Sequence, residues 1–127
     1  MADTRPDVEL RIPADSAFLS VLRTATAGLA ARLDFTLDDI EDLRIAVDEA
    51  CAMVLPQALA GSDLNCAFYL GGDTLRVDVA AACEAPRAPS HDGFAWTVLS
   101  ALTTSLDAAI DGDTLTVTLT RTSGEPV

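Results

Sequence analysis

Four short segments of the chain alternate apolar and polar residues, and this period of two constrains the fold more than any other feature. The alternation occurs at residues 8–12, 66–70, 75–79 and 114–120. A strand with this pattern buries one face and leaves the other in water. Helices are therefore expected on one side of the sheet only, which predicts an α+β two-layer sandwich.

Two helices separate the first predicted strand from the second. Apolar residues step by three or four positions from Ser16 to Leu33, and Asp15 is placed to cap this helix. Thr36 begins the next helix as its N-cap, and Asp39 completes a capping-box pattern. Pro56 ends that second helix, because proline cannot continue the hydrogen-bonding pattern.

Two predicted hairpins and a third helix make up the second half of the chain. Residues 71–73 (Gly-Gly-Asp) turn the first hairpin, and residues 111–112 (Asp-Gly) turn the second. Residues 80–93 contain two prolines and are predicted to form a loop, and helical spacing returns from Phe94 to Leu106. The predicted order is β-α-α-β-β-α-β-β, within a single domain over residues 1–127.

The charge of the chain limits its partners. Twenty acidic residues face eight basic ones, which leaves a formal net charge of −12. Such a chain is not expected to bind a nucleic-acid backbone or an anionic membrane directly, whereas a protein with a basic surface suits it. No run approaches the ~18 apolar residues of a membrane span, and the first residues lack the apolar stretch of a signal peptide. We therefore expect a cytoplasmic protein.

The cysteines and the histidine offer little chemistry. Cys51, Cys66 and Cys83 are odd in number and form no CxxC pair, so we predict buried free thiols. The single histidine, His91, lies in the predicted loop, where a solvated side chain is the simpler interpretation. One histidine gives a poor set of metal ligands, and no metal site is predicted. The common glycine-rich phosphate loops are also absent from the sequence.

Glu49 is the one carboxylate that points to catalysis. It lies in the helix that begins at Thr36, among mostly apolar neighbours and beside Asp48. A carboxylate in such surroundings suits the role of a general base. On spacing alone, however, an acid on the surface of the helix explains Glu49 more simply.

Residues 10–54 resemble the N-terminal half of the anti-sigma factor kinases, the RsbW- and SpoIIAB-like members of the GHKL ATPase superfamily. The most specific segment is AVDEA, residues 46–50, which is similar to the AVSEAxxNA box of that family. The resemblance implies the GHKL fold (Bergerat-type, histidine-kinase-like), with about five strands in a mixed sheet and three helices on one face. It also implies the family's partner switching. Such proteins sequester an alternative sigma factor of the stress-response or sporulation type, and they phosphorylate a serine of an anti-anti-sigma STAS protein.

The resemblance also places the family's site positions on this chain. Glu49 matches the general base, but Met53 stands where an asparagine holds Mg²⁺, and a thioether is a soft ligand for a hard cation. The Asp-x-Gly-x-Gly of the family falls on Ala81, Cys83 and Ala85, and its later Gly-x-Gly falls on Gly93 and Ala95. The nucleotide positions are thus degenerate, and we expect Mg·ATP to bind weakly or not at all, with no other cofactor.

Arg23 is the candidate for partner binding. The family carries an arginine in its first helix that contacts both the sigma factor and the anti-anti-sigma protein, and counting back from Glu49 without gaps places it at Arg23. The planar guanidinium suits a carboxylate on a partner, although the residues alone are equally explained by a solvated arginine.

Three functions follow from the resemblance, which also implies a homodimer. The first, which the lost nucleotide positions favour, is an anti-sigma factor with little or no ATP dependence and no enzymatic activity. The second is an active serine kinase, which the retained Glu49 keeps open. The third is a signalling module of the same fold with neither activity.

Overall fold

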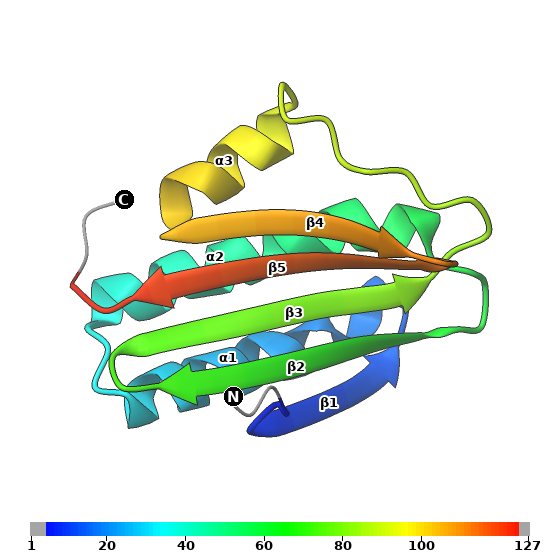
Figure 1. Ribbon diagram of the computed structural model, residues 1–127. Coiled ribbons are helices and arrows are strands. Elements are labelled where there is room, and N and C mark those ends of the chain that lie inside the picture. The colour runs from blue at the N-terminus through cyan, green and yellow to red at the C-terminus, as the bar shows by residue number, and fades with distance from the viewer. Residues whose placement is uncertain (1–4, 125–127) are drawn as a thin grey trace.

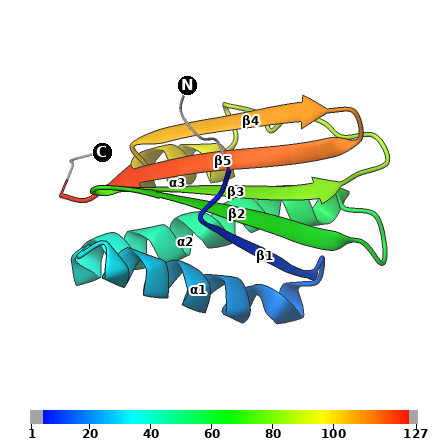
Figure 2. The ribbon, with the colours of Figure 1, turned by 60° about the horizontal axis from the view of Figure 1, so that its bottom comes forward.

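The computed structural model describes residues 5–124, which form a β-sheet with helices packed on one of its faces (Figure 1). The strands are β1 (Val8–Pro13), β2 (Asp63–Gly71), β3 (Thr74–Ala82), β4 (Ser105–Asp111) and β5 (Thr114–Thr122). The α-helices are α1 (Leu19–Arg32), α2 (Leu37–Val54) and α3 (Phe94–Leu102), and the short 3-10 turns are η1 (Ser16–Phe18) and η2 (Leu55–Gln57). Helices α1 and α2 lie side by side beneath the sheet (Figure 2). The predicted order of elements and the two-layer sandwich are confirmed.

All neighbouring strands of the sheet are antiparallel, in the order β1-β2-β3-β5-β4. The predicted mixed sheet is therefore wrong in this detail. Two antiparallel helices between β1 and β2 return the chain to the end of the sheet it left, so that β2 runs opposite to β1. Strands β3 and β4 point the same way, but β5 lies between them (Figure 1).

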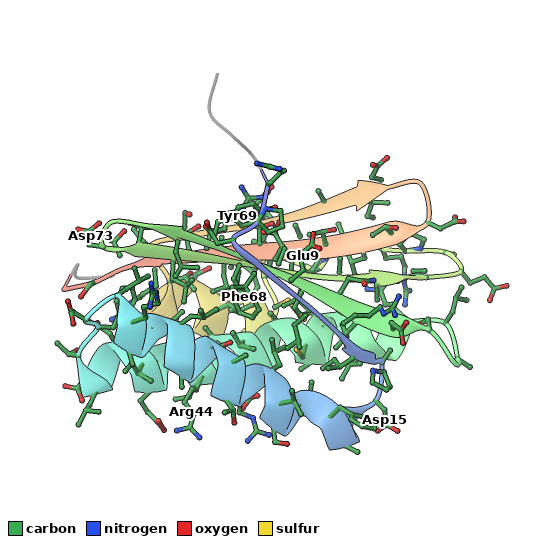
Figure 3. The ribbon with its side chains drawn as sticks, turned by 90° about the horizontal axis from the view of Figure 1, so that it is seen from below. Glu9, Asp15, Arg44, Phe68, Tyr69 and Asp73 are labelled. Carbon is green, nitrogen blue, oxygen red and sulfur yellow. The ribbon has the colours of Figure 1, made fainter. Side chains whose placement is uncertain are left out.

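The alternation read from the sequence produces the core. Phe68 of β2 lies opposite Val77 of β3, and Val77 lies opposite Leu119 of β5. The three side chains therefore form one fully buried row between the sheet and the helices. Tyr69, the next residue, lies on the face of the sheet that the helices leave open (Figure 3). A shift of register by one residue would move every one of these apolar side chains into water.

The prediction of buried free thiols is confirmed for Cys51, Cys66 and Cys83. Burial raises the pKa of both Cys51 and Cys66 to about 12, and for Cys51 the nearby Cys66 and Asp48 add to the effect. These two thiols are therefore protonated and poorly nucleophilic at neutral pH.

Local capping follows the sequence closely at the start of the helices. The hydroxyl of Thr36 accepts a hydrogen bond from the Asp39 amide at 3.1 Å, as the capping-box pattern predicts. Asp15 accepts from the Ala17 amide at 2.9 Å, although the turn it caps is the 3-10 turn η1, and α1 begins only at Leu19.

Besides the start of α1, the end of α3 and the end of β3 differ from the prediction. Helix α3 ends at Leu102, and Leu106 lies in β4 rather than in a helix, because Thr103 takes an extended backbone conformation and its hydroxyl donates to the Leu99 carbonyl. Strand β3 continues to Ala82, so the loop begins later than residue 80. Residues 80–82 pair with β5 and in part with β2, and this tertiary pairing overrides their weak strand preference.

A buried ion pair joins the sheet to the helix layer at the N-terminal end of α2. Nη2 of Arg121, on β5, lies 2.8 Å from Oδ1 of Asp39, and the two side chains are only 6% and 7% exposed. Arg121 also lies 3.2 Å from Oδ2 of Asp42 and donates to the Leu102 carbonyl at 2.8 Å. One side chain thus connects β5, the first turns of α2 and the end of α3.

The environment of Asp39 stabilises its charged form. Burial by itself raises the pKa of this carboxyl, but hydrogen bonds from Arg121, Thr36 and the Gly124 amide outweigh burial and hold the pKa below its usual 3.8. Asp39 therefore supports the fold as an anion.

Replacing Arg121 with Met should destabilise the protein by about 3–5 kcal/mol, because it leaves the Asp39 charge buried without its partner. Urea unfolding followed by circular dichroism measures this loss. Asp38→Asn removes an exposed carboxylate from the same turn and should have little effect. An Arg121→Met variant within about 1 kcal/mol of wild type would contradict the role given to the pair.

Acid should remove the same contribution from the unmodified protein. Because the folded-state pKa of Asp39 is lowered, its stabilisation is complete above 3.8 and is lost as the pH falls through the folded-state value. In Asp39→Asn this part of the pH dependence should be absent.

Candidate functional site

Three of the predicted nucleotide positions meet at a small cavity beside the C-terminal end of α2. Met53 contributes from α2, Gly93 from the N-cap of α3 and Ala95 from its first turn. The cavity has a volume of about 280 Å³. Its full lining consists of Met53, Gln57, Pro89, Ser90, Gly93, Phe94, Ala95 and Trp96.

The chemistry of this cavity is apolar. None of its lining residues is charged, so no lining side chain can neutralise a phosphate or bind Mg²⁺ through a carboxylate. The Gly93 amide, at the start of a helix where an anion could bind, donates instead to the Ser90 carbonyl at 3.1 Å. A Cβ at Gly93 would lie 3.2 Å from that same oxygen, which explains why glycine fits here. The walls suit a small apolar group.

The other three nucleotide positions do not line the cavity. Ala81 and Cys83 are buried in the core, where the Cys83 thiol donates to the Ala81 carbonyl at 3.5 Å. Cys83 also forms an isolated bridge with Ala58, and Ala85 lies exposed in the loop that follows. Apolar packing thus occupies the positions where the resembling family has polar or glycine residues.

Glu49 lies half-buried on α2, one helical turn before Met53. Within residues 5–124 the side chain of Glu49 makes neither a hydrogen bond nor an ion pair. Its side chain is not part of the cavity lining. The geometry brings Glu49 near the cavity end of the helix without joining it to the other predicted positions.

A two-point clamp, which the sequence patterns did not suggest, holds the loop over residues 84–93. Nε2 of Gln57 donates to the Arg87 carbonyl at 3.0 Å, and the Arg87 amide donates to Oε1 of Gln57 at 2.8 Å. The rings of His91 and Trp96 stack beyond the clamp, with centroids 4.2 Å apart and an angle of 8° between planes. His91 is exposed but stacked, so the expected freely solvated ring is only partly correct.

Arg23 lies on α1 and faces α2. Its Nε atom lies 2.9 Å from Oδ1 of Asp48, and the two side chains are 38% and 44% exposed. The structure therefore brings the predicted partner-binding arginine next to Asp48 of α2, which sequence spacing did not reveal. Arg23 is an ion-paired surface residue rather than a solitary one.

A larger hollow of about 570 Å³ lies on the open face of the sheet. Arg76 lies on the same face of β3 and binds Asp78 through two hydrogen bonds of 3.0 Å, with its guanidinium 4.4 Å from the centre of the Tyr69 ring. The hydrogen bond with Asp78 raises the pKa of Arg76 above its usual value. The hollow itself is lined by Glu9, Leu10, Arg11, Asn65, Cys66, Ala67, Asp78, Ala80 and Thr116.

Residues 5–124 contain no group of three or more His, Cys, Asp or Glu side chains that could hold a metal ion. No helix among these residues is long and apolar enough to span a membrane.

Comparisons with known proteins find RsbW proteins that are similar to this chain, although no family model matches it. It is 41% identical over 73 residues to the serine-protein kinase RsbW of Halalkalibacterium halodurans, a match that covers 57% of this chain and 45% of that protein. It is 32% identical over 105 residues to the anti-sigma-F factor RsbW of Mycobacterium tuberculosis, which covers 83% of this chain and 62% of that protein. The chain thus spans about half of the first relative and under two thirds of the second.

The fold comparison agrees with the sequence relatives. The structure superposes with a TM-score of 0.70 and 19% identity on the solved RsbU and RsbW domains of Rv1364c from Mycobacterium tuberculosis, covering 96% of this chain and 34% of that one. The resemblance to RsbW-like proteins is confirmed, and the chain has the fold that this resemblance implied.

Replacing Gln57 with Ala should loosen the loop over residues 84–93, because both clamping hydrogen bonds are lost. Hydrogen–deuterium exchange of peptides covering the loop should become about tenfold faster. Gln57→Glu keeps the oxygen that accepts from the Arg87 amide and should give a smaller change. Unchanged exchange in Gln57→Ala would show that other contacts hold the loop.

Proposed function

We propose that this protein is a cytoplasmic anti-sigma factor that sequesters an alternative sigma factor of the stress-response or sporulation type. An anti-anti-sigma STAS protein would release the sigma factor by competing for the same surface, with little or no dependence on ATP. The observation that carries the proposal is the 32% identity over 105 residues to an RsbW protein named an anti-sigma-F factor. The implied homodimer belongs to the same proposal.

The α1–α2 surface supports a binding role. Arg23 presents a half-exposed guanidinium there, on helices held firmly by the core beneath them. Guanidinium groups recognise carboxylates through paired hydrogen bonds, which gives a contact with an acidic side chain both strength and direction. An acidic residue on each of two competing partners would explain how one surface serves both.

The cavity beside α2 supports independence from ATP. Its volume of about 280 Å³ is at the lower limit for ligand pockets, and its lining offers a Met53 thioether where a hard cation needs oxygen ligands. Ala81 contributes a methyl group to the core and cannot accept a hydrogen bond from an adenine amino group. The residues present do not fit Mg·ATP.

An active serine kinase is the second candidate. Glu49 occupies the position of the family's general base, and a 41% identical relative is named a serine-protein kinase. Under this alternative, Glu49 would accept a proton from a serine of the STAS partner.

Arg23→Ala should weaken sigma-factor binding about tenfold or more, because it removes a charged anchor from the proposed surface. The alternative sigma factors of the genome that encodes this chain, each purified, are first screened by biolayer interferometry. Arg44→Ala is the matched control, since Arg44 is a similarly exposed arginine on α2 that pairs with Glu41. If no sigma factor binds the unmodified protein, the proposed function is wrong.

Calorimetric titration with Mg·ATP should give a dissociation constant in the high-micromolar range or weaker. Each lost charge-assisted contact costs roughly 1.5–3 kcal/mol, and two such losses multiply to about a hundredfold. Labelled ATP should transfer no phosphate to a STAS protein above the level of a Glu49→Gln control. Low-micromolar binding, with transfer that disappears in Glu49→Gln, would establish the kinase instead.

A further inference from the structure

The contact between Arg23 and Asp48 is close but incomplete. Nε of Arg23 and Oδ1 of Asp48 lie 2.9 Å apart, yet neither atom makes an aligned hydrogen bond within the described residues, and both atoms are shielded from solvent. Shielded polar atoms without hydrogen bonds are costly, and a native structure has few of them. The charges attract each other, while the hydrogen-bonding capacity of both atoms is unused.

Other arginines of the chain are held more completely. Arg76 forms two aligned hydrogen bonds with Asp78. Nε of Arg121 is also without a partner among the described residues, but its other two nitrogens donate aligned bonds to Asp39 and the Leu102 carbonyl. Arg23 instead combines a misaligned contact with a side chain that is 38% exposed. Its guanidinium can therefore leave Asp48 at low cost, because little hydrogen-bond energy is lost and both side chains are partly exposed outside the contact itself.

An external carboxylate would use the guanidinium better than Asp48 does. Paired N–H groups of an arginine can bind both oxygens of a carboxylate in one plane, and such charge-assisted bonds are roughly twice as strong as neutral ones. Asp48 already places one carboxylate beside this arginine. A carboxylate of the partner must therefore compete with Asp48 for the guanidinium and overcome the repulsion between the two carboxylates.

We propose that Asp48 is an internal competitor for Arg23: it holds the guanidinium in the free protein and is displaced by a carboxylate of the bound partner. Asp48 is then a positioning and specificity residue. A partner gains affinity from displacing it only if the partner's carboxylate binds the Arg23 guanidinium in better alignment than Asp48 does. The partner is the sigma factor of the proposed function, on which this inference rests.

A double-mutant cycle tests this proposal with the full chain and whichever sigma factor the screen identifies. Asp48→Asn keeps the shape of the side chain and removes its charge, and it should raise the affinity about threefold to fivefold. In an Arg23→Ala background the same change should have no effect. Glu41→Gln removes a comparable charge from the same helix and should leave the affinity within about a factor of 1.5. Asp48→Ser is a second variant, and circular dichroism checks that each variant is folded.

The possible outcomes separate this inference from the function on which it rests. If the unmodified protein binds but Asp48→Asn binds equally or more weakly, Asp48 does not compete for Arg23, and the anti-sigma function stands. A gain that persists without Arg23, or that Glu41→Gln reproduces, would indicate a general charge effect and would also overturn the proposal. If the unmodified protein binds no sigma factor, both the function and the inference fail.

Discussion

The arrangement of the two layers depends on the buried contact between Arg121 and Asp39. It connects β5, an inner strand of the sheet, with the first turn of α2, and the same guanidinium reaches the last carbonyl of α3. Hydrophobic packing is non-directional and would tolerate small rotations of a helix on a sheet, whereas a charge-assisted hydrogen bond at 2.8 Å does not. Helix α2 has 18 residues and is therefore about 27 Å long. Fixing its first turn sets the direction of the far half, where Asp48, Glu49 and Met53 lie.

Helix α2 consequently carries three separate tasks on one rigid element. Its buried side completes the core, with Leu43, Val47 and Val54 fully enclosed or nearly so. Its surface toward α1 holds Asp48 against Arg23. Its last turn forms one wall of the apolar cavity through Met53. A substitution on one of these surfaces should leave the other two in place. The core and the Arg121 contact hold the helix in position, and the helix would shift only if one of them were lost.

The apolar residues at the nucleotide positions have a structural consequence of their own. Ala81 and Cys83 allow the backbone to continue in extended pairing to the end of β3 and one bridge beyond it, and their side chains are buried there. A carboxylate at Ala81 would have to be buried in this packing without a counter-charge, which is costly. Stable packing and polar ligands are in conflict at these positions. In the proposed function, recognition depends instead on the exposed α1–α2 surface.

The sequence alone determined what depends on neighbours along the chain. Alternation assigned the buried and open faces of the strands, three- and four-residue spacing found the helices, and Thr36 marked the start of α2, because each signal is contained in a few consecutive residues. The resemblance to RsbW-like proteins likewise rested on one continuous segment.

The tertiary structure decided what depends on residues far apart in the chain. These contacts are Arg121 with Asp39, 82 positions away, Gln57 with Arg87, 30 positions away, and Arg23 with Asp48. It also moved Leu106 from a helix into β4, because the pairing partner that makes it a strand residue lies on β5. Spacing in the chain carries no information about such contacts, since they exist only when the sheet and the helices have packed together.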